Sequence, residues 1–423
     1  MTGNGKTGRT EFSISDAEEW LLGLEVFGIE LGLGRIEMLL GMLGSPQRLP
    51  AVVHVVGSNG KSSVTRMIGA ILDCHSVRSG VYLSPHFISF TERLLIAGEP
   101  TPDNEFAACA AQVREASLDL LRASPELGEV TQFEALTAIA FLQMNTAGVE
   151  VAVIEAGLGG RLDATNVVDS VVEVCTTISL EHTALLGDTI EAVAAEKLDV
   201  VKAGSTLVVP PSFDPDALRV AVDRCAEQQA RLIVAGSDAP AELSVGGQYQ
   251  RQNFALAAAA AHSLLGSIDA GALEAAAANL SIPGRYQTVG SDPLTIFDGA
   301  HNAEAARALA ASIGLEHGVS RVVGCLSVLD DKDADVMLRE FAACSDEVIF
   351  TRSSHPRAVD PTVLQRRWEA IASTPASVRE SPHAALRAAR EAATGGGLAY
   401  AAGSLYLIAD LLRAEGAPSG STL

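Results

Sequence analysis

Short β-branched runs alternate along the chain with longer apolar patterns of helical period. The first run, residues 51–56, is Ala-Val-Val-His-Val-Val and stops at a glycine, which is typical of a buried parallel strand. Most neighbouring runs are separated by helical patterns of ten or more residues. This alternation predicts α/β layers built on parallel sheets. The further strand-like runs cover residues 149–155, 171–178, 206–209, 295–298, 321–325, 347–351 and 398–401.

The helical patterns include two before the first strand. Ser15 to Glu18 has the spacing of a capping box, and the helix that it opens continues through Trp20 and Leu24. A second apolar-periodic stretch covers residues 36–43. Later, residues 236–247 show no strand or helix period. Two alanine-rich helices follow them, at residues 253–265 and 270–280.

The alternation breaks once, at Ser281-Ile282-Pro283-Gly284-Arg285, and restarts after it. Pro-Gly with polar neighbours is typical of a hinge between domains. A length of 423 residues agrees with two to three domains. We therefore expect an N-terminal α/β domain at residues 1–285 and a smaller one at residues 286–423.

The charge balance narrows the range of partners. The chain has 52 acidic and 30 basic residues, a formal charge of −22. Such a field repels phosphate backbones, so we expect no nucleic-acid groove, although a few positioned groups can still hold one anionic ligand. The most apolar stretch, Phe254 to Ala261, is far shorter than a membrane span, so we expect no membrane partner.

The cysteines and the N-terminus indicate a cytoplasmic globular protein. Six scattered cysteines include no CxxC pair, which excludes a zinc ribbon and favours reduced thiols. The first ten residues, MTGNGKTGRT, lack the apolar core of a signal peptide. Gly5-Lys6-Thr7 looks like part of a phosphate loop, but no strand precedes it and no periodic helix follows. We expect a solvated tail there.

A stronger candidate for phosphate binding is Gly57 to Ser63, GSNGKSS, between the first strand and a helix at residues 64–72. Glycines let backbone N–H groups approach an anion, and a helix N-terminus adds partial positive charge. Lys61 can neutralise phosphates, and Ser62 stands where a magnesium-linked hydroxyl usually does. Val55 occupies the first glycine position of GxxxxGK[ST], and a strand-to-helix turn is the alternative. We favour a phosphate-binding loop.

Polar side chains also follow other strands, where α/β proteins bind their ligands. Glu155 ends the second long strand and can bind Mg²⁺ directly or through water, although a carboxylate capping the next turn is the alternative. His182 follows the next strand. Alone it would be a hydrogen-bonded core residue, but with Glu155 and a phosphate loop nearby a metal or phosphate role is favoured. Asp298 opens DGAHN in the second domain, a moderately specific turn sequence.

The interpretation of Lys197 depends on whether it is considered alone or with the rest of the chain. Glu196 and Lys197 are adjacent, and from the residues alone we expect a surface ion pair of little energetic value.

With these motifs in order, the chain resembles the folylpolyglutamate synthase/dihydrofolate synthase family, within the Mur-ligase-like ATP-dependent amide ligases. Two sites depart from the family pattern. The family's loop usually reads GTNGKGS, so Ser58 and Ser62 differ, and Leu198-Asp199 replaces the usual Ala-Gly. The matching segments span nearly the whole chain: HVVGSNGKSS, YLSPHFISFTER, FEALTAIAF, EAGLGGRLDATNVV, SLEHTALLGDT, AAEKLDVVK, PGRYQ, FDGAHNAEAARAL and GSLY.

The resemblance implies a role for each matching residue. The ATP phosphates would lie on Ser58, Asn59, Gly60, Lys61 and Ser62, and the rest of the nucleotide would touch Asn253, Arg285 and Asp298. Mg²⁺ would be held by Ser84, Glu155 and His182. The pterin or pteroate would lie on Phe133, Glu134, Arg161 and Asp163. The glutamate side would be His301, Ser404 and Tyr406.

Lys61, His182 and Lys197 would be the catalytic residues. The family carries the lysine at position 197 as a carbamate formed with CO₂, which would make it a ligand for a second Mg²⁺.

The resemblance also implies an activity. Residues 1–285 would form a P-loop-type, ATP-binding, Mur-ligase-like domain, and residues 286–423 a Rossmann-like glutamate-ligase domain. The protein would be a monomer that uses ATP and Mg²⁺ to ligate L-glutamate to dihydropteroate, folylpolyglutamate or both, through an acyl phosphate.

Two alternatives remain. One is a related Mur-type amide ligase with a different acyl or amine substrate. The other is a nucleotide-binding module that has lost ligation, and the intact Lys61, Glu155, His182 and Lys197 argue against it.

Overall fold

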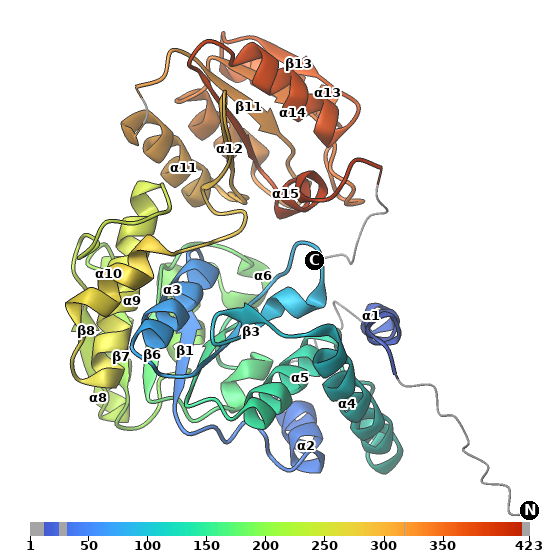
Figure 1. The fold of residues 1–423 in the computed structure, drawn as a ribbon, viewed down its shortest axis with the longest axis vertical. Helices are drawn as coiled ribbons and strands as arrows, with labels where there is room; N and C mark the ends of the chain where they lie inside the picture. The colour runs from blue at the N-terminus through green and yellow to red at the C-terminus, as the bar shows by residue number, and fades with distance from the viewer. Residues whose placement is uncertain (1–11, 25–31, 317, 417–423) are drawn as a thin grey trace, which may run out of the picture.

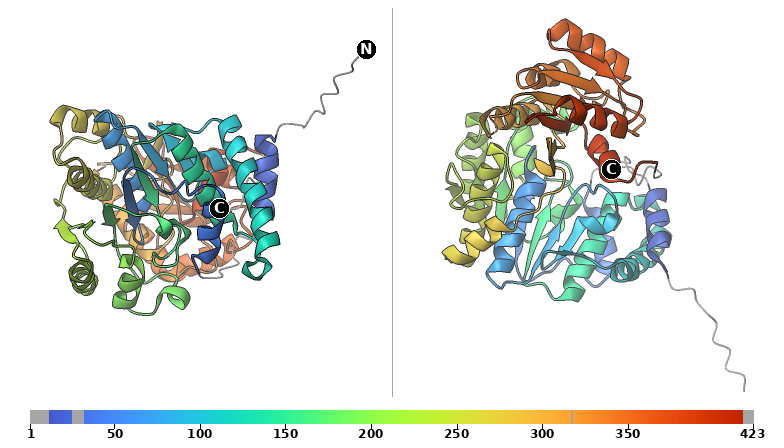
Figure 2. Two further views of the ribbon diagram at one scale, coloured as in Figure 1. Left: turned by 90° about the horizontal axis from the view of Figure 1, so that it is seen from below. Right: turned by 45° about the horizontal axis from the view of Figure 1, so that its top comes forward.

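The computed structural model describes residues 12–24, 32–316 and 318–416. They form two α/β layers, and each layer is here one sheet together with the helices that pack on it (Figure 1). The smaller sheet and its helices lie at one end of the long axis, and the larger sheet with its helices lies below them (Figure 1; Figure 2, right). The expected tail around Gly5-Lys6-Thr7 lies outside the described residues. No described helix is both long enough and apolar enough to span a membrane.

The larger sheet has eight strands in the order β4-β3-β2-β5-β1-β6-β7-β8. Its central strand, β1, is buried at every residue and pairs in parallel with β5 and β6. Only the edge hairpin β3-β4 runs antiparallel to its neighbours. The bounds are β1 Val52–Val56, β2 Ser79–Tyr82, β3 Leu94–Ile96, β4 Glu99–Pro100, β5 Val151–Glu155, β6 Val172–Cys175, β7 Thr206–Val209 and β8 Arg231–Val234.

Helices cover both faces of this sheet, as its mostly apolar central strands require. Val53 and Val55 of β1 pack into a core with α3, α9 and α10, whereas Val52 and Val56 point to the opposite face, with α1, α2, α4, α5, α7 and α8. The bounds are α1 Ile14–Gly23, α2 Gly34–Met42, α3 Lys61–Cys74, α4 Asp103–Ala123, α5 Gln132–Ala147, α6 Thr183–Leu186, α7 Ile190–Leu198, α8 Pro215–Gln228, α9 Gln248–Leu265 and α10 Ala270–Ala278. Three 3-10 turns, η1 Phe90–Arg93, η2 Pro125–Leu127 and η3 Ala164–Val167, complete this part.

The smaller sheet has six strands in the order β13-β12-β11-β14-β10-β9, all parallel except β9. Helices α11, α12 and α13 pack on one face, around Trp368 and Phe341, and α14 and α15 pack on the other. The bounds are β9 Gln287–Ser291, β10 Leu294–Phe297, β11 Val322–Leu326, β12 Glu347–Phe350, β13 Ala376–Val378, β14 Leu398–Ala402, α11 Ala303–Glu316, α12 Ala334–Ala342, α13 Pro361–Ile371, α14 Pro382–Ala392 and α15 Leu405–Leu412.

The predicted α/β class is confirmed, and all eight predicted strand runs contain strands. The capping box predicted at Ser15 is wrong. Ser13 is the N-cap, because its side chain accepts from the N–H of Asp16 and the Asp16 carboxylate accepts from the N–H of Ser13. The first alanine-rich helix begins at Gln248 rather than at Asn253, since polar residues form its first turn.

A glycine sets the distance between helix α3 and strand β2. A Cβ atom on Gly69 would lie 2.4 Å from Cγ2 of Val81, well inside van der Waals contact. Val81 is β-branched and buried, so its side chain has little freedom to move away. The helix that carries the candidate phosphate loop is therefore held against the sheet by the absence of a side chain.

We expect Gly69→Ala to destabilise the fold despite the better helix propensity of alanine. The propensity gain is about 1 kcal/mol, whereas overpacking a core costs about 1–3 kcal/mol. Gly41→Ala is the matched control, because a Cβ in that helix meets nothing within 4 Å. Urea unfolding should show a lower midpoint for Gly69→Ala and an unchanged or higher one for Gly41→Ala. A stabilised Gly69→Ala variant would contradict this packing argument.

Candidate functional site

A cavity of about 620 Å³ lies between the two sheets. Its lining comes from the segments that follow β1, β5 and β6 in the larger sheet and β10 in the smaller one. Carboxyl ends of parallel strands thus meet at one place, where α/β proteins bind their ligands. Thirteen of the predicted residues line it: Ser58, Asn59, Gly60, Lys61, Ser62, Ser84, Glu155, His182, Lys197, Asn253, Arg285, Asp298 and His301.

The loop after β1 is built for close approach of a ligand to its backbone. Gly60 is the N-cap of α3 with φ +88°, and a Cβ there would lie 2.8 Å from Oδ1 of Asn253. Both requirements favour glycine. The loop is anchored to the segment after β6, because Ser58 N–H donates to the Thr177 carbonyl at 2.8 Å. A helix N-terminus with such a loop is a ready anion site.

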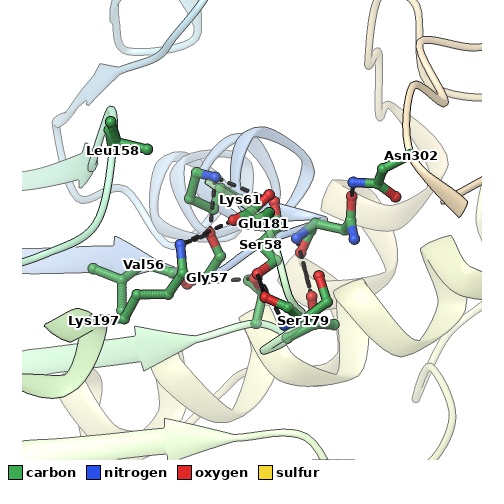
Figure 3. Close-up of polar contacts among 12 residues, drawn as sticks. Val56, Gly57, Ser58, Lys61, Leu158, Ser179, Glu181, Lys197 and Asn302 are labelled. Carbon is green, nitrogen blue, oxygen red and sulfur yellow. Dashed lines mark hydrogen bonds and ion pairs between the residues drawn. The ribbon is translucent and has the colours of Figure 1, made fainter. Parts of the chain in front are cut away.

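Lys61 lies over this loop. Its Nζ donates to the carbonyl oxygens of Gly57 at 2.9 Å and Ser58 at 3.3 Å. Figure 3 shows Lys61 and Lys197 reaching the same Gly57 carbonyl from different elements. Two ammonium groups are therefore concentrated beside a loop of backbone N–H donors, which favours an anion as ligand.

Glu155 provides negative charge in the same cavity. It is 1% exposed and accepts from Ser62 Oγ at 2.8 Å and from the Ser84 N–H at 2.9 Å. Burial raises the pKa of this carboxyl, while Lys61 and the two hydrogen bonds oppose the rise. A buried carboxylate with a raised pKa would gain from a bound cation.

The oxygen atoms around Glu155 suit Mg²⁺. The Ser62 hydroxyl contacts both the Glu155 carboxylate and the Ser84 carbonyl, the latter at 3.2 Å. Among the described residues, no three His, Cys, Asp or Glu side chains group closely enough to hold a metal by themselves. Mg²⁺ usually keeps several waters and binds one or two carboxylates plus phosphate oxygens, so this donor set fits it. His182 lines the same cavity, and burial lowers its pKa, which favours the neutral ring.

The surface ion pair expected for Glu196 and Lys197 is wrong. Lys197 is 1% exposed, and its Nζ donates to the Gly57 carbonyl at 3.0 Å and to Glu181 Oε1 at 3.1 Å. Glu196 instead pairs with Arg161 at 2.9 Å. Adjacent residues on a helix point in different directions, so only one of the two reaches the site.

The Lys197 amine lies in an unusual electrostatic setting. Burial, and then the charge of Lys61, lower its pKa, while Glu181 opposes them. Burial raises the pKa of Glu181, but Lys61 and Lys197 outweigh it and bring that pKa to about 2. A lysine with a depressed pKa is more often neutral and therefore nucleophilic.

The second sheet contributes a buried carboxylate and an imidazole. Asp298 follows β10, accepts from the N–H groups of Tyr286 at 2.7 Å and Ala300 at 2.8 Å, and contacts the Tyr249 hydroxyl. Burial lowers the pKa of His301 to about 4, so its ring is neutral at pH 7. Asp298 thus ties the segment between the sheets to the cavity wall.

Two hydrogen bonds join the phosphate loop directly to Asn302, which follows β10, and to the first turn of α11. Asn59 Nδ2 donates to Glu304 Oε2 at 2.7 Å. Asn59 Oδ1 accepts from Asn302 Nδ2 at 2.8 Å, and Figure 3 shows this bond at Asn302. Sequence reasoning missed Asn302 and Glu304 as partners, although both lie within the quoted FDGAHNAEAARAL segment. It also missed Glu181, which precedes His182, and Tyr249, for which the sequence carries no signal.

Six predicted residues do not line this cavity: Phe133, Glu134, Arg161, Asp163, Ser404 and Tyr406. Several of them have structural partners. The buried Asp163 accepts from the Leu158 N–H at 2.8 Å and so holds the glycine-rich segment after β5. Ser404 is the N-cap of α15, and Tyr406 stacks 4.1 Å from the His355 ring. Their predicted binding roles remain predictions.

Two family models match the chain. The Mur ligase middle domain matches residues 55–288, and the glutamate ligase domain of Mur ligases matches residues 284–405. The dihydrofolate synthase/folylpolyglutamate synthase of Bacillus subtilis is 31% identical over 428 residues, which cover 94% of this chain and 97% of the relative. The probable bifunctional folylpolyglutamate synthase/dihydropteroate synthase of Haloferax volcanii is also 31% identical, over 93% of this chain. This chain spans 50% of that relative's length.

Solved structures agree with the whole fold. Mycobacterium tuberculosis folylpolyglutamate synthase complexed with ADP has a TM-score of 0.87 at 29% identity and covers 94% of this chain and 97% of its own. The bifunctional folylpolyglutamate synthase/dihydrofolate synthase of Yersinia pestis, complexed with AMPPNP and Mn ion, has a TM-score of 0.82 at 28% identity. It covers 97% of this chain and 99% of its own.

Glu134 offers a test of structural against binding roles. Its buried carboxylate pairs with Arg35 at 2.8 Å and caps α5 through the Thr131 N–H. We expect Glu134→Gln to lower the unfolding free energy by about 3 kcal/mol, because the buried Arg35 would lose the charge of the Glu134 carboxylate. The exposed Glu129→Gln variant is the control. Denaturant unfolding measures the effect, and an unchanged unfolding free energy with impaired turnover would instead make Glu134 a ligand-binding residue.

Proposed function

The chain belongs to the folylpolyglutamate synthase/dihydrofolate synthase family of Mur-type ligases, and we propose that it ligates L-glutamate to a pteroate or folate carboxylate using ATP. Two family models in the expected order and the full-length B. subtilis relative support this proposal. The observation that carries it is the shared cavity in which Lys61, Glu155, Lys197 and His301 meet between the two sheets. An amide ligase needs such a place, because nucleotide and both substrates must meet there.

The phosphate loop would bind the ATP phosphates. Its N–H groups and the N-terminus of α3 would face the phosphate oxygens, and Lys61 would exchange its carbonyl partners for the β- and γ-phosphates. Asn253, Arg285 and Asp298 would line the rest of the nucleotide site. The complexes of the M. tuberculosis protein with ADP and the Y. pestis protein with AMPPNP support this assignment.

Glu155, Ser62, Ser84 and His182 would hold a divalent metal ion beside the phosphates. When bound, that ion supplies positive charge that offsets the repulsion between the anionic substrates. The Mn ion in the Y. pestis structure supports a divalent cation in the family. We propose Mg²⁺ as this ion, since oxygen donors dominate the set.

The reaction would proceed in two steps. The pteroate or folate carboxylate attacks the γ-phosphorus of ATP, and the bond to the bridging oxygen breaks to leave ADP and an acyl phosphate. The neutral amine of glutamate then attacks the acyl carbon and expels inorganic phosphate, forming the amide and losing a proton. Lys61 would stabilise charge on the transferred phosphoryl group. The cleft between the two sheets would exclude water from the acyl phosphate.

We also propose that Lys197 carries a carbamate. Its amine would attack CO₂ and lose one proton, which replaces a buried cation by an anion with two oxygen donors. The lowered pKa of Lys197 supports the needed neutral amine. Glu181 would lose its counter-charge on modification and would then need a cation nearby, which a second Mg²⁺ would provide.

We further propose that the two domains divide at residue 285 and that the protein is a cytoplasmic monomer. Six free cysteines support a reducing location. Phe133, Arg161 and Asp163 would serve the pterin side, and His301, Ser404 and Tyr406 the glutamate side.

We expect the purified protein to convert ATP to ADP only when glutamate and a pteroate or folate acceptor are both present. Mass spectrometry should show an acceptor heavier by one glutamyl residue. Lys61→Ala should lose roughly 10²-fold or more in kcat, because it removes charge from the transferred phosphoryl group. The exposed Arg122→Ala variant should keep full turnover. Ligation of a different acid or amine would assign another Mur-type ligase, and ATP binding without any ligation would overturn the proposal.

Lys197→Ala should lose most activity while its fold persists, and added formate or acetate should restore part of it by filling the carbamate oxygen positions. Intact-mass or ¹³CO₂ NMR measurements on the wild type should detect the modification directly. Lys197→Arg is the control, since it keeps a cation and cannot form the carbamate. Full activity of Lys197→Arg, or an unmodified Lys197 in an active nucleotide complex, would overturn the carbamate.

A further inference from the structure

A second cavity, of about 530 Å³, lies beside α3 between the edge hairpin of the larger sheet and the segment that joins the two sheets. Arg66, Gly69, Ala70 and Asp73 form one side of it, at the spacing of a single helix face. Among the described residues, none lines both this cavity and the first one. Its volume is in the range of small-molecule sites.

Most of the remaining wall is apolar. Val81 and Leu95 come from adjacent strands β2 and β3, Leu280 from the segment between the sheets, and Leu412 from the end of α15. Apolar walls with a few polar groups are typical of sites for organic ligands. The chemistry of the polar groups therefore decides which ligand fits.

The two acidic side chains in the wall are already satisfied. The Glu92 carboxylate accepts from the backbone N–H groups of Phe87, Ile88 and Ser89, each at 2.9 Å. Asp73 accepts from the Ser79 N–H and hydroxyl, both at 3.0 Å. Neither acid pairs with a basic side chain of the cavity.

Arg66 is different. Its side chain makes no hydrogen bond or ion pair to any residue in the described part of the chain, and it is half-buried. Burial lowers its pKa, and the more distant carboxylates of Glu155 and Glu92 oppose that effect. A half-buried guanidinium without a protein contact partner has five donors available for a ligand.

We propose that this cavity binds a small organic monocarboxylate. The carboxylate pairs with the Arg66 guanidinium in the two-bond geometry that arginine favours, and the apolar body lies against Val81, Leu95 and Leu280. Glu92 and Asp73 lie in the same wall, so their charges disfavour a dianion such as phosphate. The ligand also touches Gln287 and Leu412 and therefore contacts both α/β layers.

Matched ligand pairs test the site on the wild-type protein. Isothermal titration is run with AMPPNP and Mg²⁺ saturating the first cavity, using 4-phenylbutanoate and octanoate against their neutral amides. The acid that binds better of the two should bind roughly tenfold or more tightly than its own amide, because the amide lacks the charged hydrogen bonds to Arg66. Preference for octanoate assigns a fatty-acid-like ligand, and preference for 4-phenylbutanoate an aromatic one. Equal binding of acid and amide, or no binding at millimolar concentration, overturns the proposal.

Variants locate the binding. Arg66→Met should weaken acid binding roughly tenfold or more while leaving amide binding unchanged, and Ala70→Phe should weaken both by filling the cavity. Arg339→Met, at an exposed position of α12, is the control and should bind like the wild type. Unchanged acid binding by Arg66→Met refutes the site. If that variant fails to fold, Arg66→Lys, which keeps the charge, should retain the preference for acid over amide. The ligand comparison on the wild type does not depend on the ligase proposal.

Discussion

The carbonyl oxygen of Gly57 accepts hydrogen bonds from two ammonium groups, and the charges of the rest of the site are placed around this pair of bonds. Lys61 reaches it from the helix that follows and Lys197 from a helix far along the chain. The chain has a formal charge of −22 and only five lysines. Two of these lysines at one carbonyl therefore make a local concentration of positive charge in an otherwise acidic protein. Like charges this close repel, and Glu181 and Glu155 partly balance them. An anionic ligand would complete that balance.

This arrangement depends on the order of strands. β1 lies between β5 and β6, so the segments that carry Glu155 and Glu181 emerge on either side of the phosphate loop. Parallel pairing places all three strand ends at one edge. Gly69 allows α3, the helix after the loop, to lie close against β2. This packing fixes the position of the N-terminus of α3, where Lys61 lies. Packing of the core and placement of charge are therefore set by the same elements.

The sequence predicted the central strands well because they are buried on both faces and apolar almost throughout, as in Val52 to Val56. It missed β2, whose Ser-Gly-Val-Tyr composition is weakly strand-like, and short edge strands such as β4 and β13. In the site, Glu155 could be predicted because it ends a strongly apolar strand. Lys61 could be predicted because it lies just after another such strand, where the glycine-containing loop leads into a helix. Lys197 could not be placed from the residues alone, because its burial arises from a helix that packs under the loop. Asn302 and Glu304 meet Asn59 across more than 240 residues, a distance over which local patterns carry no information.

The amide of Asn59 has a thermodynamic consequence. It belongs to the loop that faces the phosphates, and both its nitrogen and its oxygen are bonded to residues of the C-terminal layer. Any ligand that changes the position of this side chain changes the free energy with which the two layers associate. Linkage makes this effect reciprocal, so the association of the layers must alter ligand affinity by the same factor. The two halves of the chain, produced separately, would then bind nucleotide with an affinity that rises with the concentration of the missing half.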